Sequence, residues 1–132
     1  MNIFYYLDVR SNVCPVKEYL KKFRGKTKLL LDLDGKIRSI ANKGSISLPI
    51  AKPLQNYSIF EIMKPFRDLE IRLLCVFVNG SLVLLHAFDK PKHYENTKKI
   101  NKYIEKNYKI GQNYYNFLKD EKEDGRNKEE YR

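Results

Sequence analysis

The most constraining feature of this sequence is the dipeptide Asn79-Gly80, which lies between two apolar segments. Residues 69–78 precede it and residues 81–88 follow it, and both segments consist mainly of apolar side chains. An Asn-Gly pair favours a two-residue turn in which both residues have positive φ, and such a turn joins antiparallel strands. The pattern therefore predicts a β-hairpin here, with Pro91 ending its second strand.

Two other segments have the composition of strands. Residues 2–7 and 59–66 are short and rich in apolar and aromatic side chains, as strands usually are. Residues 45–57 contain two prolines, which predicts a surface loop in front of the second of these strands.

Apolar side chains recur at helical spacing in three places. Pro15 suits the first position of a short helix that ends near Gly25, a second helix is predicted from Thr27 to Gly44, and residues 95–118 predict a long final helix. The helices do not alternate with the last strands. The order therefore predicts an α+β fold: a small, mostly antiparallel sheet of about four strands, helices packed on one face, and a long C-terminal helix.

The length of 132 residues suits one domain. Residues 1–118 are predicted to form this domain, whereas residues 119–132 alternate in charge and predict a disordered tail. No apolar run approaches the roughly 20 residues of a membrane span, and the N-terminus lacks a signal-peptide pattern. We therefore expect a cytoplasmic protein with no membrane association.

Histidine and cysteine are too sparse to predict a metal site. The chain has two histidines, His86 and His93, and two cysteines, Cys14 and Cys75, and no pair has ligand spacing. We expect free thiols, no metal and no cofactor.

The chain is strongly basic, with a formal net charge of +10 and 13% aromatic residues. Residues 1–118 carry +11, and the last fourteen residues carry −1. This balance favours nucleic acid as a partner. An AT-rich genome would enrich lysine, asparagine, isoleucine and tyrosine in the same way without any binding role.

Several short motifs lie between Gly44 and Lys92, and His86 comes fourteen positions after Arg72. The motifs are Lys52-Pro53-Leu54, Phe60-Glu61-Ile62, Glu70-Ile71-Arg72-Leu73, Asn79-Gly80 and Leu84-Leu85-His86-Ala87-Phe88-Asp89-Lys90. Their order and spacing resemble the HigB-like, phage-derived branch of the RelE/ParE toxin superfamily, over about residues 3–118.

The resemblance implies a RelE-like fold and the toxin of a type II toxin–antitoxin system. Such a toxin is an mRNA interferase, a metal-independent endoribonuclease that cuts translated mRNA, usually on the ribosome, and a small helix-turn-helix antitoxin blocks it. The family's Glu-Leu-Arg is Glu61-Ile62-Met63 here, so one arginine is missing. A non-catalytic nucleic-acid-binding or gyrase-directed relative on the same fold is the alternative.

RNA cleavage requires no cofactor, because the 2′-hydroxyl is an internal nucleophile and cationic side chains can offset the charge of the transition state. The candidate catalytic residues are Arg72, Lys90, Lys92 and His86, and the candidate RNA-binding residues are Lys64, Arg67 and Lys52.

Each of these candidates also has a structural interpretation. Arg72 could pair with Glu70 or Asp89 instead of a phosphate. A regular two-residue hairpin would place Arg72 and His86 on opposite faces of the sheet, and a one-residue bulge would reverse this. With the regular parity, His86 is predicted to be a core or hydrogen-bonded histidine. The lysines, including those of the final helix, could be ordinary solvated side chains.

Overall fold

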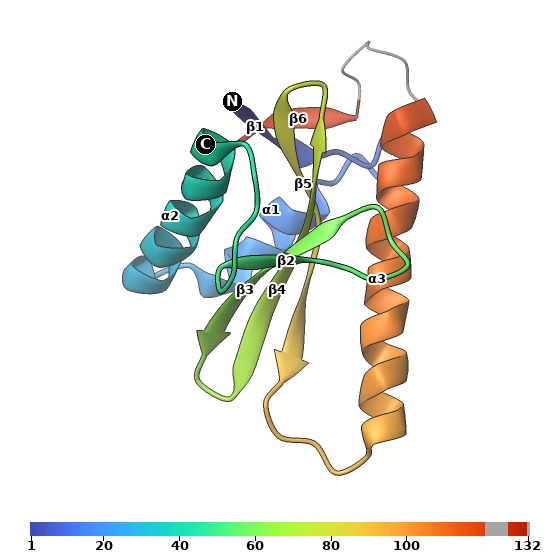
Figure 1. Cartoon of the computed structure of the whole chain (residues 1–132). Coiled ribbons are helices and arrows are strands. Elements are labelled where there is room, and N and C mark those ends of the chain that lie inside the picture. The colour runs from blue at the N-terminus through green and yellow to red at the C-terminus, as the bar shows by residue number, and fades with distance from the viewer. Residues whose placement is uncertain (121–126, 132) are drawn as a thin grey trace.

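The structure of this protein is a computed structural model that describes residues 1–120 and 127–131. These residues form one sheet, helices on both of its faces and the loops between them (Figure 1). The elements are β1 (Asn2–Tyr6), α1 (Pro15–Leu20), the 3-10 helix η1 (Lys21–Phe23), α2 (Thr27–Lys43), β2 (Ala51–Pro53), β3 (Phe60–Phe66), β4 (Leu69–Val78), β5 (Ser81–Pro91), α3 (Thr97–Asp120) and β6 (Lys128–Glu130).

The sheet has six strands in the order β2-β3-β4-β5-β1-β6. Neighbouring strands are antiparallel, except that β1 runs parallel to β5. The predicted α+β fold with a mostly antiparallel sheet is confirmed, but the sheet has two more strands than expected. Both are short edge strands: β2 forms inside the predicted loop, where it pairs with β3, and β6 pairs with β1.

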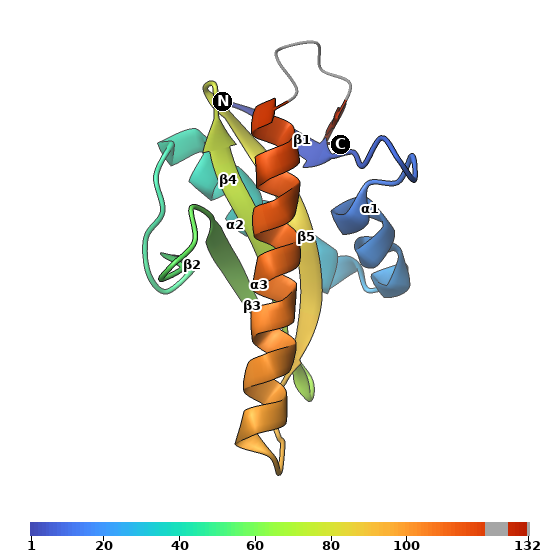
Figure 2. The ribbon, with the colours of Figure 1, turned by 90° about the vertical axis from the view of Figure 1, so that its right-hand side faces the viewer.

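Helices cover both faces of the sheet, as Figures 1 and 2 show. One apolar cluster lies between the sheet and α1 and α2 and includes Val16, Ile37 and Leu73. A second lies between the sheet and α3 and includes Leu74 and Leu118. The first two helices pack on one face as predicted, whereas the C-terminal helix packs on the other. Burial on both faces explains why β4 is a continuous apolar run and not an alternating one.

The predicted hairpin is confirmed, with φ of 49° at Asn79 and 74° at Gly80. Its register is not regular, because Cys75 pairs with Leu84 whereas Leu74 pairs with His86. Leu85 is the extra residue of this β-bulge. A regular hairpin would place Arg72 and His86 on opposite faces of the sheet, but the bulge shifts the pairing by one residue. Both side chains therefore lie on the same face, the one that α3 covers.

Glycine sets two features of the helices. Gly44 ends α2 in the left-handed conformation, with φ of 68°, as the sequence predicts. Gly111 lies in α3 against the sheet, where a Cβ atom would come within 2.6 Å of Leu74 Cδ1. The absence of a side chain at Gly111 therefore lets α3 approach β4 closely.

The C-terminal segment differs from the disordered tail that the sequence predicts. Lys128–Glu130 form β6 against β1, and Tyr131 packs beside Tyr5 with 5.2 Å between ring centroids. Asn127 is buried as well. The prediction was wrong for this segment because Tyr131 is an apolar anchor; the rest of the predicted tail after Asp120 lies outside the described residues.

Within residues 1–120 and 127–131, no helix combines the length and the apolar composition that a membrane crossing requires.

Candidate functional site

Arg72 lies in the middle of β4, and its side chain is 7% exposed. Its Nη1 donates to Glu61 Oε1 at 2.7 Å, and its Nε donates to Glu70 Oε1 at 2.5 Å. Two carboxylates therefore hold the guanidinium, and one of them belongs to Glu70, one of the two partners that the structural interpretation of Arg72 names.

Glu61 of β3 is fully buried and connects three elements of the fold. The Tyr108 hydroxyl of α3 donates to Glu61 Oε2 at 3.0 Å, and Lys52 Nζ of β2 lies 3.4 Å from Glu61 Oε1. We name these residues the Arg72 cluster: Arg72, Glu61, Glu70, Tyr108 and Lys52. Throughout the described part of the chain, every buried side-chain nitrogen and oxygen has a hydrogen-bond partner. The cluster is thus a satisfied polar network that joins α3 to the sheet.

The opposite charges in the Arg72 cluster stabilise each other. Burial by itself would lower the pKa of Arg72, but Glu61 and Glu70 outweigh it and the pKa is raised. Burial and the adjacent Glu61 raise the pKa of Tyr108. Arg72 therefore stays charged and Tyr108 stays protonated near neutral pH. An arginine that left this network would leave a buried carboxylate without its main partner, which is costly. The arrangement favours the structural interpretation of Arg72 over a free phosphate clamp.

His86 is hydrogen-bonded to α3. Its Nε2 lies 2.8 Å from Asn107 Oδ1, and the Asn107 amide donates to the Tyr103 carbonyl oxygen at 2.9 Å. Because the Asn107 oxygen is thereby an acceptor, Nε2 of His86 carries the proton. Burial lowers the pKa of His86, although the hydrogen bond to Asn107 opposes the shift. His86 is therefore neutral at pH 7 and positions α3.

Three other candidates gather where β5 ends. The backbone N–H of Lys92 donates to the carbonyl oxygen of Asp68, in the β3–β4 turn, at 3.0 Å. Arg67, in the same turn, is exposed and stacks its guanidinium 4.9 Å from the Phe66 ring centroid. Lys90 lies opposite Glu70 in the ladder. This end of the sheet therefore presents Arg67, Lys90 and Lys92 together.

The remaining two candidates do not join that group. Lys64 lies 3.4 Å from Asp32 of α2, on the opposite face of the sheet from Arg72. Lys52 belongs to the Arg72 cluster through Glu61. The predicted RNA-binding residues are therefore divided among three places, and only Arg67 lies beside Lys92.

Lysines are frequent from the end of β5 to the middle of α3. Residues 90–109 contain seven lysines and two glutamates. We name these lysines the basic strip: Lys90, Lys92, Lys98, Lys99, Lys102, Lys106 and Lys109. None of them forms an ion pair within the described residues, whereas the lysines of α1 and η1 are paired with carboxylates.

Helical geometry aligns most of the basic strip. Lys99, Lys102, Lys106 and Lys109 are three or four residues apart, so they lie on one face of α3 and are exposed. At 1.5 Å per residue they extend over roughly 15 Å. An exposed row of unpaired cations of this length suits a chain of phosphates.

Sequence reasoning missed the two residues that organise the Arg72 cluster. Tyr108 belongs to the apolar stripe of the predicted helix, and Glu61 belongs to the second motif. The usable signal was Arg72 itself, because an arginine inside a continuous apolar strand requires a buried carboxylate. In the described ranges 1–120 and 127–131, no group of histidine, cysteine and acidic side chains could hold a metal ion.

Comparison with known proteins found no match to any family model, curated protein or solved structure.

Proposed function

We propose that this chain is the toxin of a type II toxin–antitoxin system and acts on RNA as a metal-independent endoribonuclease. Its substrate is translated mRNA on the ribosome, in the cytoplasm, and its antitoxin is a small helix-turn-helix protein. The resemblance to the HigB-like branch motivates this proposal. The observation that carries it is the basic strip, whose unpaired lysines continue to the end of β5 beside Arg67.

The basic strip suits RNA for an electrostatic reason. Lysines that neutralise phosphates release condensed counterions, and this release supplies much of the affinity for nucleic acid. Lysines already paired with carboxylates would give less, because their partners must first be displaced. The unpaired row on α3 and the cations at the end of β5 therefore make a better phosphate surface than the paired lysines of α1 and η1.

The proposed reaction takes place at the end of β5. The 2′-hydroxyl of the RNA attacks the adjacent phosphorus and loses its proton, a 2′,3′-cyclic phosphate forms, and the 5′-oxygen leaves with a proton. Lys90, Lys92 and Arg67 offset the charge that develops on the phosphoryl oxygens. Arg72 and His86 act indirectly in this proposal, because they hold α3 and the sheet in place.

A second candidate function is nucleic-acid binding without cleavage. The specific observation in its favour is that Arg72 is committed to Glu61 and Glu70, while His86 is buried and neutral. Two of the four candidate catalytic residues, Arg72 and His86, are thus already hydrogen-bonded inside the fold. Both candidates use the basic strip, and they differ only in whether RNA is cut.

Cleavage of RNA by the purified protein in the presence of EDTA separates the two candidates. The proposal predicts products with 2′,3′-cyclic phosphate and 5′-hydroxyl ends. A Lys90→Gln, Lys92→Gln double variant should lose roughly 10²–10³ in rate, the typical cost of removing a donor to a developing oxyanion. Lys28→Gln combined with Lys43→Gln removes two exposed lysines of α2, on the other side of the sheet. This double variant is the matched control and should cut at the wild-type rate.

Ribosome-dependent cleavage requires the same assay on translating ribosomes. Binding of RNA without cleavage in both settings would favour the second candidate. An unchanged cleavage rate in the Lys90→Gln, Lys92→Gln variant would show that the end of β5 takes no part in the reaction.

A further inference from the structure

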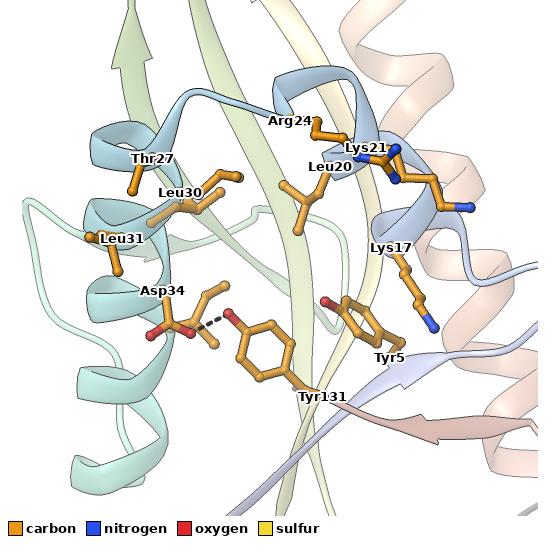
Figure 3. Close-up of a pocket in the computed structure, with 12 residues that line it drawn as sticks. Tyr5, Lys17, Leu20, Lys21, Arg24, Thr27, Leu30, Leu31, Asp34 and Tyr131 are labelled. Atoms are coloured by element: carbon orange, nitrogen blue, oxygen red, sulfur yellow. Dashed lines mark hydrogen bonds between the residues drawn. The ribbon is translucent and has the colours of Figure 1, made fainter.

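A groove lies between α1 and α2, on the sheet face opposite α3, and is shown in Figure 3. Its volume is about 420 Å3. Tyr5 of β1 lies at its base, Leu20 of α1 lines one side, and Leu30 of α2 lines the other. The size falls within the range of functional pockets.

The groove is apolar inside and open to solvent. Leu20 and Leu30 are half-buried, and Leu31 at the rim is 65% exposed. One exposed leucine would be unremarkable. Leu20, Leu30 and Leu31 surround one hollow and give it an apolar lining, into which apolar side chains of a partner can insert.

Cationic side chains line the α1 side of this groove. Lys17, Lys21 and Arg24 line it together, as Figure 3 shows, and Arg24 forms no ion pair with any other described residue. On the α2 side, Asp34 is engaged by Arg38 at 3.0 Å. Glu18 pairs with Lys21 at 2.9 Å and Glu129 pairs with Lys17 at 2.6 Å. Among these three cations, Arg24 is therefore the one that can meet a negative charge of a partner without displacing a carboxylate of the described residues.

The chain's own C-terminal segment illustrates the chemistry that this groove accepts. Tyr131 enters one end, where its hydroxyl donates to Asp34 Oδ1 at 2.5 Å, and Glu129 accepts from Lys17 at 2.6 Å. An aromatic ring therefore occupies the hollow while a nearby carboxylate contacts the cationic side. The other end, with Leu20, Leu30 and Arg24, is open.

The elements that line the groove indicate which secondary structure a bound peptide would have. The leucines of the open end stand on α1 and α2, whose backbone hydrogen bonds are satisfied internally. An extended peptide would find no ladder to join there, whereas a helix brings its own backbone hydrogen bonds and needs only side-chain contacts.

We propose that this groove binds an acidic amphipathic helix of a partner protein. Apolar side chains of the helix enter between Leu20, Leu30 and Leu31, and a carboxylate of the helix faces Arg24. This inference does not depend on the proposed ribonuclease, because no residue of the groove belongs to the basic strip or to the Arg72 cluster.

The test is selection from a displayed library of random peptides of about 20 residues, long enough for a helix of about 30 Å. The library is first depleted on the Leu31→Glu variant and then selected on the wild-type protein. We expect enriched peptides with net negative charge and apolar residues at helical spacing. These peptides should bind Leu31→Glu and Arg24→Glu at least about tenfold more weakly than wild type, a change of about 1.4 kcal/mol.

Leu48→Glu is the matched control, because Leu48 is 73% exposed and lies outside the groove. It should bind the selected peptides as the wild-type protein does. Enrichment of neutral or basic peptides, failure to enrich any, or equal binding to Leu31→Glu would overturn the proposal. Loss of RNA binding by Leu31→Glu would also overturn the proposal, because it would show that the groove binds nucleic acid.

Discussion

Two carboxylates hold the guanidinium of Arg72, and this arrangement determines what its removal should do. Arg72→Ala leaves Glu61 fully buried without its closest partner, so we expect a loss of about 3–5 kcal/mol in the free energy of unfolding. Urea unfolding measures this loss. The control is Arg67→Ala, an exposed arginine in the adjacent turn, which should change stability by no more than about 0.5 kcal/mol.

A second variant separates the lost ion pair from the lost volume. Arg72→Met combined with Glu61→Met removes both charges and keeps apolar bulk, so it should be clearly more stable than Arg72→Ala. If Arg72→Ala unfolds like wild type, the Arg72 cluster does not contribute as we describe, and a functional role for a free guanidinium would regain support.

The stability of the protein should fall in mild acid because of His86. Burial lowers its pKa in the folded protein despite the hydrogen bond to Asn107, whereas the unfolded chain binds this proton near pH 6.5. Below about pH 6.5 the unfolded state therefore binds more protons, and the free energy of unfolding decreases as the pH falls. Urea unfolding between pH 7 and 5 should show this decrease in wild type and a weaker one in His86→Gln. His93→Gln, a change at an exposed loop histidine, should retain the wild-type profile; identical profiles for wild type and His86→Gln would contradict the assignment.

At the scale of the elements, two helical glycines should respond to alanine in opposite directions. Gly35 of α2 has no atom within 4 Å of an added Cβ, so Gly35→Ala should stabilise the protein by roughly 0.5–1 kcal/mol. At Gly111 of α3 an added Cβ meets Leu74 and Ile59, and such overpacking costs about 1–3 kcal/mol. Gly111→Ala should therefore be destabilising despite the same gain in helix propensity. Urea unfolding of the two variants checks this, and stabilisation by Gly111→Ala would show that α3 does not pack as closely as described.

Local patterns were sufficient to predict most elements of this fold. Asn79-Gly80 predicted the hairpin, and Gly44 predicted the end of α2, because each residue type determines its own backbone geometry. The bulge at Leu85 has no comparable local signal, and it decides which residues share a face with Arg72. The edge strands β2 and β6 were also missed, since each is three residues long and is stabilised by pairing with a distant segment.

The site was predictable to a lesser extent than the fold. The lysine content predicted a surface that binds a polyanion. The sequence could not distinguish the paired lysines of α1 and η1 from the unpaired lysines of α3, because pairing depends on tertiary neighbours. Arg72 was correctly singled out as unusual. Its partners Glu61 and Tyr108 come from another strand and from α3, so only the three-dimensional arrangement identifies the network.

At the scale of the whole molecule, the two proposed surfaces lie on opposite faces of the sheet (Figure 2). The basic strip runs along α3, and the apolar groove lies between α1 and α2. A partner helix in the groove would therefore leave the lysines of α3 uncovered. We expect a selected acidic peptide at saturating concentration to leave the affinity for single-stranded RNA unchanged within about twofold, since the surfaces are independent. Fluorescence anisotropy of labelled RNA measures this, and strict competition between peptide and RNA would contradict the separation.

The salt dependence of RNA binding tests most directly the claim that the basic strip contacts RNA. In the triple variant Lys102→Gln, Lys106→Gln, Lys109→Gln, up to three phosphate contacts are lost, so the slope of log K against log salt concentration should become shallower by about 2 for single-stranded RNA. The matched control Lys26→Gln, Lys28→Gln, Lys43→Gln removes the same charge from exposed lysines before and along α2. The account predicts a shallower slope and weaker binding for the α3 variant, with the control close to wild type. Equal slopes for the two triple variants would contradict it.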